Sequence, residues 1–438
     1  MNHRTVAVCT AALVSTAALT GCGGDSGGNG GSSSDSSGPI TLEYWAWAPG
    51  LEQAVELWNE ANPDVRVVVK NQAGGDDLVT RVVTAAQAGE APDLVQAEYQ
   101  ALPTLISNDV LADISDHLEG TGTEDAFAEG LWQQVTLGTD ALYAIPQDSG
   151  PLMFYYRHDL FEEYDLEVPT TWDEFADTAR ALRDADSDRY LTTFSAQDAG
   201  LFAGLAQQAG AQWWTTEGES WKVAIDDEAT SRVAEFWGEL VAEDVIHNEP
   251  MYTPAWNQAL NTGEQIAWVS AVWAPGVLAS SAEDTAEQWA MAPLPQWEAG
   301  ENATGSWGGS TTAVTNDSDH AEAAAEFAAW INTDPEALAT MVREGGIYPA
   351  ATAAQTGEAL SEPPAFFANQ PDFYEIAAGV AEGTAPAAWG PNVNVAYSTF
   401  NDAFGSAASA RSDFGAALAE TQNATVADLE RQGFQVSR

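Results

Sequence analysis

The sequence predicts an α/β protein of two domains, on two observations. Segments with strand and helix patterns alternate from residue 40 to residue 96. About 400 residues remain beyond the N-terminal segment, which is more than one hydrophobic core usually serves. The order strand, helix, strand, helix, strand predicts a largely parallel sheet with helices on both faces. Ligands of such sheets bind beside the carboxyl ends of the strands, so we expect site residues there.

Each element follows from a local pattern. Runs rich in β-forming residues predict strands at 40–46, 65–69, 93–96, 142–146, 190–194 and 265–269. Apolar residues at helical spacing predict helices near 51–58, 78–86, 172–183, 201–209, 231–241, 255–261, 321–331 and 335–342. The helix at 172–183 has the clearest start, because Thr171 and Glu174 have the spacing of a capping box.

The N-terminus reads as an export signal. His3 and Arg4 precede a short apolar run, which is too short for a permanent membrane helix. Leu19-Thr20-Gly21-Cys22 resembles a bacterial lipobox, which implies cleavage of residues 1–21 and a lipid on Cys22. An ordinary secretory signal with a chance Cys is the alternative. Residues 22–39 are rich in Gly and Ser and predict a flexible tether.

Composition excludes several function classes. The chain carries 66 acidic and 14 basic residues, a formal net charge of -52, which argues against nucleic acid and anionic lipid as partners. The acidic residues are spread along the chain, which favours a solvated surface over an electrostatic funnel for a cationic ligand. The only Cys besides Cys22 is Cys9, inside the predicted signal, so no disulfide and no cysteine metal site is expected.

Tryptophan is the second unusual feature. There are 17 Trp residues, against 15 Phe and 11 Tyr. A flat ring with one N–H donor suits a ligand that is apolar on one face and polar at its edges, as a sugar is. On helical faces, at Trp58, Trp132, Trp172, Trp237 and Trp330, packing is the better interpretation.

The order of segments resembles a known family, the extracytoplasmic solute-binding lipoproteins of ABC importers, and among them the carbohydrate-binding, maltose-binding-protein-like branch. The resemblance extends from Ile40 to about Phe434. Its anchors include LWNEANPDVRVVV, RVVTAAQAGEAPDLVQAE, LYAIPQDSGPLMFYYRHDLFEEYDLEVPTTWDEF, LNTGEQIAWVSAVW, WAMAPLPQ, GSWGGSTTAVTNDSDHAEAAAEFAAWI and GGIYPA. None is decisive alone, but their order behind a lipobox is specific.

This resemblance implies two discontinuous α/β lobes joined by a hinge, with a ligand cleft between them that closes on the ligand. It places residues 40–147 and 305–334 in the N-terminal lobe and residues 148–304 and 335–438 in the C-terminal lobe. It implies a monomer that captures a sugar, expected to be an oligosaccharide, and delivers it to the transmembrane subunits of an ABC permease. No catalysis, cofactor or metal is expected.

The predicted site combines indoles, which stack on sugar rings, with carboxylates and amides, which bind hydroxyls. For the first lobe and hinge the candidates are Trp45, Trp47, Glu98, Asp148 and Trp307. For the second lobe they are Trp213, Trp214, Trp256, Trp273, Trp389, Asn392 and Asn394. Trp273 in SAVWAP matches a position where the family places a stacking aromatic, and glycines beside Trp307 allow close approach of the backbone.

Two other functions stay open at this stage. A lipid-anchored glycoside hydrolase needs only two suitably spaced carboxylates, although no HExxH, GxSxG or Walker A motif is present. The same fold with an aromatic cage and acids could instead bind a quaternary ammonium ion or a polyamine. The Asp184-x-Asp186-x-Asp188 repeat lacks the Gly and Glu that complete a calcium loop, so it predicts no metal site.

Overall fold

The computed structural model describes residues 38–218 and 220–437. The chain divides into one unit of residues 1–38 and a second of residues 39–438. The predicted signal, Cys22 and all of the predicted tether except Gly38 and Pro39 lie outside the described residues. Within the described part of the chain, no helix has the length and apolar character needed to cross a membrane.

A five-stranded sheet organises the first lobe. Its order is β2-β1-β3-β10-β4, from β2 (Val65–Asn71), β1 (Ile40–Ala46), β3 (Leu94–Glu98), β10 (Ser310–Val314) and β4 (Ala144–Pro146). β1 pairs in parallel with β2 and β3, whereas β10 runs antiparallel to both β3 and β4. The largely parallel sheet predicted from residues 40–96 is confirmed, and its antiparallel strand comes from a segment more than 160 residues after β4.

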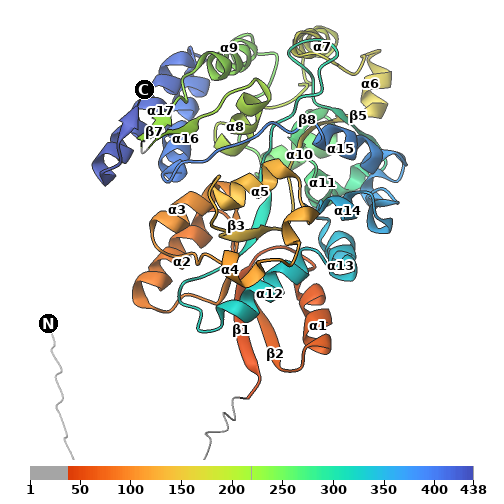
Figure 1. Ribbon diagram of the computed structural model, residues 1–438. Helices are drawn as coiled ribbons and strands as arrows, with labels where there is room; N and C mark the ends of the chain where they lie inside the picture. The colour runs from red at the N-terminus through yellow and green to blue at the C-terminus, as the bar shows by residue number, and fades with distance from the viewer. Residues whose placement is uncertain (1–37, 219, 438) are drawn as a thin grey trace, which may run out of the picture. The chain divides into compact units, whose positions relative to one another are not determined.

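Helices flank this sheet (Figure 1). They are α1 (Leu51–Ala61), α2 (Asp76–Ala88), α3 (Leu102–Ser107), α4 (Ser115–Leu118), α5 (Glu129–Thr136), α12 (Ala321–Ile331) and α13 (Pro335–Gly345). α1 buries Leu51, Ala54, Val55 and Trp58 on one face, as its apolar spacing predicts. Trp58 also packs edge-on against Phe327 of α12, with ring centroids 5.4 Å apart, so α1 and α12 share one core.

Two smaller sheets belong to the second lobe. The antiparallel sheet β8-β5-β9 contains β5 (Leu152–Arg157), β8 (Ala267–Ala271) and β9 (Trp289–Pro293). The sheet β11-β7-β6 contains β6 (Trp214–Glu217), β7 (Ser220–Val223) and β11 (Val436–Ser437). The strand predicted at 190–194 is wrong, because Tyr190 and Thr193 form only isolated bridges, to Gln265 and His247.

The second lobe is rich in helices. They are α6 (His158–Glu163), α7 (Trp172–Ala185), α8 (Ala199–Gln208), α9 (Glu228–Ala242), α10 (Pro254–Thr262), α11 (Ala274–Ser281), α15 (Phe373–Ala381), α16 (Val393–Ala410) and α17 (Gly415–Gln432). The short α14 (Thr352–Gln355) instead contacts the first lobe, where Thr352 Oγ1 donates to Ala126 O at 3.2 Å. The predicted capping box is confirmed: Thr171 accepts a hydrogen bond from the backbone N–H of Glu174, whose carboxylate accepts one from the backbone of Thr171. Trp172 and Trp237, assigned to packing, are 1% and 3% exposed.

Three segments that connect the sheets lie side by side at residues 147–151, 305–310 and 346–350. The backbone N–H of Gln147 donates to Ser310 O at 2.9 Å, and that of Ala350 donates to Gln147 O at 3.0 Å. Trp307 N donates to Gly150 O at 2.8 Å. The chain therefore crosses between the two sheets three times within one hydrogen-bonded bundle, which we call the crossing bundle.

Glycine is required within the crossing bundle and where the bundle meets α8. A Cβ on Gly305 would lie 1.8 Å from the carbonyl oxygen of Gly204, and one on Gly150 would lie 2.2 Å from that of Trp307. Neither space can hold a methyl group, so these glycines allow backbone to pack directly on backbone.

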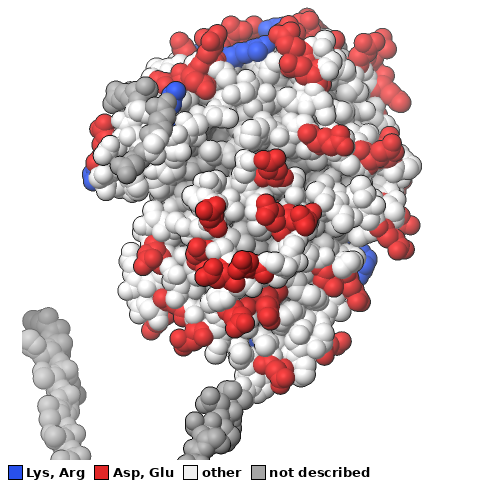
Figure 2. Space-filling view, viewed as in Figure 1, with Lys and Arg blue, Asp and Glu red and all other residues white. Residues whose placement is uncertain are grey.

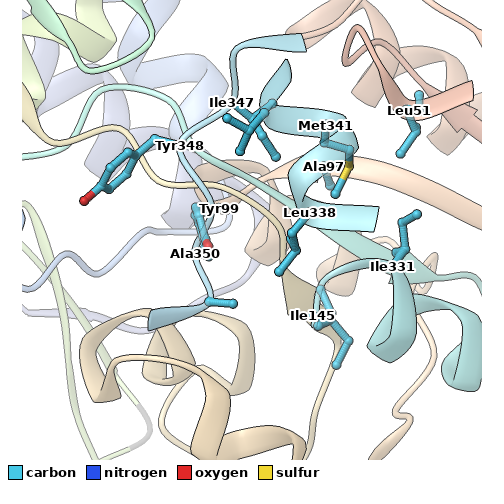
Figure 3. Close-up of a cluster of buried hydrophobic side chains, with 14 of the residues drawn as sticks. Leu51, Ala97, Tyr99, Ile145, Ile331, Leu338, Met341, Ile347, Tyr348 and Ala350 are labelled. Carbon is cyan, nitrogen blue, oxygen red and sulfur yellow. The ribbon is translucent and has the colours of Figure 1, made fainter. Parts of the chain in front are cut away.

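α13 packs with the first sheet rather than with the second lobe. Leu338 and Met341 of α13 lie in one hydrophobic cluster with Leu51 of α1 and Ile145 of β4 (Figure 3). A Cβ on Gly345 would meet Pro49 O at 2.1 Å, so the end of α13 also touches the start of α1. We therefore propose that the N-terminal lobe, expected from residues 40–147 and 305–334, continues through α13 and that the last crossing is at 346–350.

The acidic residues do not gather into one patch on the visible face. Figure 2 shows Asp and Glu distributed over that face, with few Lys and Arg between them. Several of the described arginines pair with neighbouring carboxylates, such as Arg180 with Glu243 at 2.8 Å and Arg411 with Asp244 at 2.6 Å. This distribution is typical of an acidic solvated surface.

Candidate ligand-binding site

A cavity of about 330 Å³ opens between the lobes at the crossing bundle. From the first sheet's side it is lined by Glu98, Tyr99, Gln100, Leu131 and Gln134. From the second lobe it is lined by Gln197, Asp198, Ala199, Gly200, Trp389, Tyr397 and Asn401. Its volume lies at the lower end of the range of about 300–1,000 Å³ for small-molecule sites.

A second cavity of about 280 Å³ adjoins the first. Its lining includes Trp47, Gln96, Asp148, Trp273 and Ile347. The two cavities share Glu98, Trp307 and Gly308, so they form one cleft on both sides of Trp307. Glu98 is the last residue of β3 and Trp47 follows the end of β1, so both lie at carboxyl ends of parallel strands, as predicted.

Trp307 stands at the centre of this cleft, on the second crossing segment. Its indole lies against α8 of the second lobe, where a Cβ on Gly200 would be 2.9 Å from Trp307 Cδ1. Its carbonyl oxygen accepts a hydrogen bond from Trp273 Nε1 at 2.9 Å, and the two rings meet at 64° with centroids 4.9 Å apart. Because the indole is only half-buried and lines both cavities, it presents an apolar surface to a ligand.

A row of tryptophans supports Trp307 from behind. Trp256 packs edge-on against Trp268 at 5.1 Å, Trp268 against Trp273 at 6.1 Å, and Trp273 against Trp307. Trp256 and Trp268 are 2% and 1% exposed, so they fill the core and hold the two cleft indoles in place. The tryptophan excess thus serves packing and the cleft together.

Asp148 holds the crossing bundle together. Its Oδ1 accepts hydrogen bonds from the backbone N–H of Ser310 at 2.5 Å and from Ser310 Oγ at 2.7 Å. Its carbonyl oxygen accepts one from Tyr99 OH at 3.2 Å. Burial raises the pKa of Asp148, while the two bonds from Ser310 act in the opposite direction. Asp148 therefore fixes the geometry of the hinge in addition to lining the second cavity.

Two carboxylates face the first cavity from opposite lobes. Glu98 Oε2 accepts a hydrogen bond from Gln100 Nε2 at 2.6 Å. Asp198, which directly precedes α8, accepts one from Ser195 Oγ on its Oδ2. Burial raises the pKa of Asp198 to about 6, and the bond from Ser195 lowers it in part. Each carboxylate can accept further hydrogen bonds from a ligand.

The lobes also contact each other directly at the edge of the cleft. Trp389 Nε1, on the loop before α16, donates to Gln134 Oε1 of α5 at 3.2 Å. Thr104 Oγ1 of α3 donates to Pro391 O at 3.1 Å. Trp389 is further held by Tyr397, whose ring meets it edge-on at 6.4 Å. These bonds join the two lobes at the edge of the cleft.

Six of the predicted residues line the cleft: Trp47, Glu98, Asp148, Trp273, Trp307 and Trp389. Trp45 lies within β1 beside α2 and lines neither cavity: its Nε1 donates to Glu43 Oε1 at 2.6 Å, and Arg81 lies over its ring. Asn394 is exposed on the first turn of α16 and lines neither cavity. Whether the six cleft residues contact a ligand stays a prediction.

The other predicted residues are in the core. Trp213 donates to Thr230 Oγ1 at 3.0 Å and is 5% exposed, while Trp214 is fully buried. Asn392 donates to Thr425 O at 2.9 Å beneath α17. Trp214 supports the cleft indirectly, because it fills the space left by the missing side chain of Gly390, next to Trp389. We correct these residues, and Trp256, to packing positions, because they are at most 5% exposed and line neither cavity.

Sequence reasoning missed several cleft residues. Asp198, Gln134 and Tyr397 line the first cavity, and nothing in their local sequence distinguishes them from other polar residues. Tyr252 is 46% exposed, with its ring 6.4 Å from that of Trp307, and its φ of 62° is unusual for a bulky residue.

No cluster of three or more His, Cys, Asp or Glu side chains suited to a metal ion occurs in residues 38–218 and 220–437. In the Asp184-x-Asp186-x-Asp188 repeat, Asp186 Oδ2 instead accepts a hydrogen bond from Tyr164 OH at 2.8 Å and pairs with Arg189. This segment lies at the C-terminal end of α7, and the Asp186 carboxylate is held there by partners within the protein.

Comparison with known proteins identifies the family of the chain. Residues 44–338 match the family model of the bacterial extracellular solute-binding proteins. The lactose-binding protein of Rhizobium radiobacter is 27% identical, over 76% of this chain and 80% of that protein. The arabinooligosaccharide-binding protein of Halalkalibacterium halodurans is 26% identical, over 69% of each chain.

Solved structures give the same assignment. The galacto-N-biose-/lacto-N-biose I-binding protein of an ABC transporter from Bifidobacterium longum, in complex with lacto-N-biose, is 28% identical. It superimposes with a TM-score of 0.82 over 92% of this chain and all of that one. A binding protein from B. animalis subsp. lactis, in complex with β-1,6-galactobiose, has a TM-score of 0.80 at 25% identity over 91% of this chain and all of that one. The chain belongs to the bacterial extracellular solute-binding proteins, and its two α/β lobes have the architecture of that family.

Proposed function

We propose that this protein captures a short oligosaccharide in the cleft between its lobes and delivers it to the transmembrane subunits of an ABC permease. The observation that carries the proposal is Trp307, a half-buried indole with a cavity on each side and carboxylates and amides around it. An indole covers the apolar face of a pyranose, while Glu98, Asp198 and Gln134 accept or donate bonds at its hydroxyls.

The relatives support this substrate class. Two of the proteins that match are named for lactose and arabinooligosaccharides, and two of the similar structures hold lacto-N-biose and β-1,6-galactobiose. The two cavities, of about 330 and 280 Å³, together suit a ligand of about two rings. We infer that the protein acts as a monomer by binding and closure, without hydrolysis, as its relatives are binding proteins.

A panel of mono- and disaccharides tests the proposal. We expect at least one disaccharide to raise the melting temperature and to change tryptophan emission, because Trp307, Trp273 and Trp389 line the cleft. Isothermal titration then measures the affinity. Stabilisation by a quaternary ammonium ion or a polyamine, with no sugar active, would contradict the proposal. Release of reducing ends from an oligosaccharide would identify a hydrolase instead.

We further propose that a lipid on Cys22 holds the protein at the outer face of the cell membrane. The lipobox-like sequence Leu19-Thr20-Gly21-Cys22 and the Gly/Ser-rich segment after it support this location. Cys22→Ser is expected to release the protein into the medium with its sugar affinity unchanged, as measured by fractionation and titration. A Cys22→Ser protein that stays with the membrane would show that another element anchors it.

A further inference from the structure

The cleft has an unusual charge. Three ionisable carboxylates line its two cavities, Glu98, Asp198 and Asp148, and neither lining contains a Lys, Arg or His. The other polar side chains of the first cavity are uncharged, among them Gln100, Gln134, Gln197 and Asn401. A ligand that enters the cleft therefore meets negative charge from both lobes, and no lining side chain carries a compensating positive charge.

Asp198 is the lining carboxylate with the clearest capacity to bind a donor on the ligand. Only its Oδ2 bonds a described side chain, the hydroxyl of Ser195. Its side chain forms no capping bond to the backbone of α8 and lines the first cavity, so it can accept a further hydrogen bond there. Burial raises the pKa of Asp198 to about 6, as expected for a carboxylate with few partners and little water. A donor on the ligand would supply the missing partner.

The start of α8 is the feature of this wall that could attract an anion. The first N–H groups of a helix carry partial positive charge and often bind phosphate or carboxylate. Here, however, Asp198 precedes α8 directly, and its own carboxylate lies at that helix end. Asp198, Ala199 and Gly200 line the same cavity, so an anionic ligand at the start of α8 would lie close to the Asp198 carboxylate.

From this arrangement we propose that the cleft selects its cargo by charge: it accepts neutral sugars and sugars with a free amino group, and it rejects sugars that carry a carboxylate or a phosphate. The inference rests on the proposed sugar-binding function and narrows its substrate class. An ammonium group would bind between Glu98 and Asp198, as donor to both lobes. A uronate would place like charges together in a partly desolvated space, which is unfavourable.

Matched sugars test the proposal on the full-length protein. The panel consists of galactose, galactosamine and galacturonate, the corresponding glucose set, and galactobiose beside digalacturonate. Within every set that binds, we expect the acidic sugar to be at least about tenfold weaker than the neutral one, or about 1.4 kcal/mol. We expect the amino sugar to bind at least as well as the neutral one. A uronate within threefold of its neutral counterpart would overturn the proposal. No binding by any sugar would contradict the proposed function itself.

Variants separate charge from shape. Asp198→Asn keeps the size and an acceptor but removes the charge, so we expect the amino sugar to lose at least about fivefold relative to the neutral sugar, and the uronate to gain. Asp227→Asn is the control, because Asp227 also precedes a helix, α9, where it accepts a bond from Thr230 N outside both cavities. Ratios that stay unchanged in Asp198→Asn and in Glu98→Gln would show that the lining carboxylates do not select the cargo.

Discussion

Replacing Trp307 with alanine is expected to weaken sugar binding by about 2–4 kcal/mol, roughly thirtyfold to seven-hundredfold, as for a central tryptophan of a binding surface. The indole forms part of both cavities and lies between α8 and Trp273, so its loss removes the stacking surface and merges the two cavities. The main-chain bonds of Trp307, to Gly150 and from Trp273 Nε1, do not need its side chain and should persist.

The comparison that makes this result specific is Trp45→Ala. Trp45 is half-buried as Trp307 is, but it lines neither cavity and contacts Glu43 and Arg81. We expect Trp45→Ala to lower the free energy of unfolding in urea while leaving the sugar affinity within about twofold. Trp307→Ala should show the opposite order, with the larger loss in affinity. Equal losses of affinity in the two variants would remove Trp307 from the proposed site.

Gly200→Ala should separate stability from binding. Alanine in a helix is more favourable than glycine by up to about 1 kcal/mol, which favours α8. The added Cβ, however, would lie 2.9 Å from Trp307 Cδ1 and 3.0 Å from Nε1, so the indole must move into the cleft. We expect an affinity loss of at least about tenfold with a melting temperature that is unchanged or higher, measured by titration and thermal unfolding.

Gly276→Ala is the matched control for this substitution. Gly276 is also a helical glycine, in α11, and a Cβ there would meet no atom within 4 Å. It should therefore change neither the sugar affinity nor the cleft. Gly200→Ala could bind sugar as tightly as Gly276→Ala only if the Trp307 indole can move without any loss of sugar affinity. That result would contradict the placement of Trp307 at the centre of the site.

Local pattern was enough for β1, β2, β3 and β4 of the first sheet, whereas no strand was predicted at β10. The strand predicted at 40–46 is β1 with the same bounds, because its alternation is read directly from one segment. The strand predicted at 190–194 failed for the opposite reason. Strand structure needs a neighbour, and Tyr190 and Thr193 each find only one bridging residue.

The same limit explains the site. Trp256 and Trp273 both stand near the start of an α-helix and both pack against Trp268, but only Trp273 lines the cleft, whereas Trp256 is 2% exposed. Asp198 and Glu98 are 100 residues apart, and only the crossing bundle brings them to one cavity. Strand ends located Trp47 and Glu98, whereas side chains that meet across the hinge carry no local signature.

The strand order of the first sheet has a consequence for how the protein is made. β4 joins the sheet only through β10, because β10 lies between β3 and β4. During synthesis β4 is complete at residue 146, and it has no partner strand in this sheet until residue 314 has been added. A nascent chain that ends anywhere between these points carries an unfinished sheet with an open edge, and no contiguous N-terminal fragment short of β10 can build the first lobe.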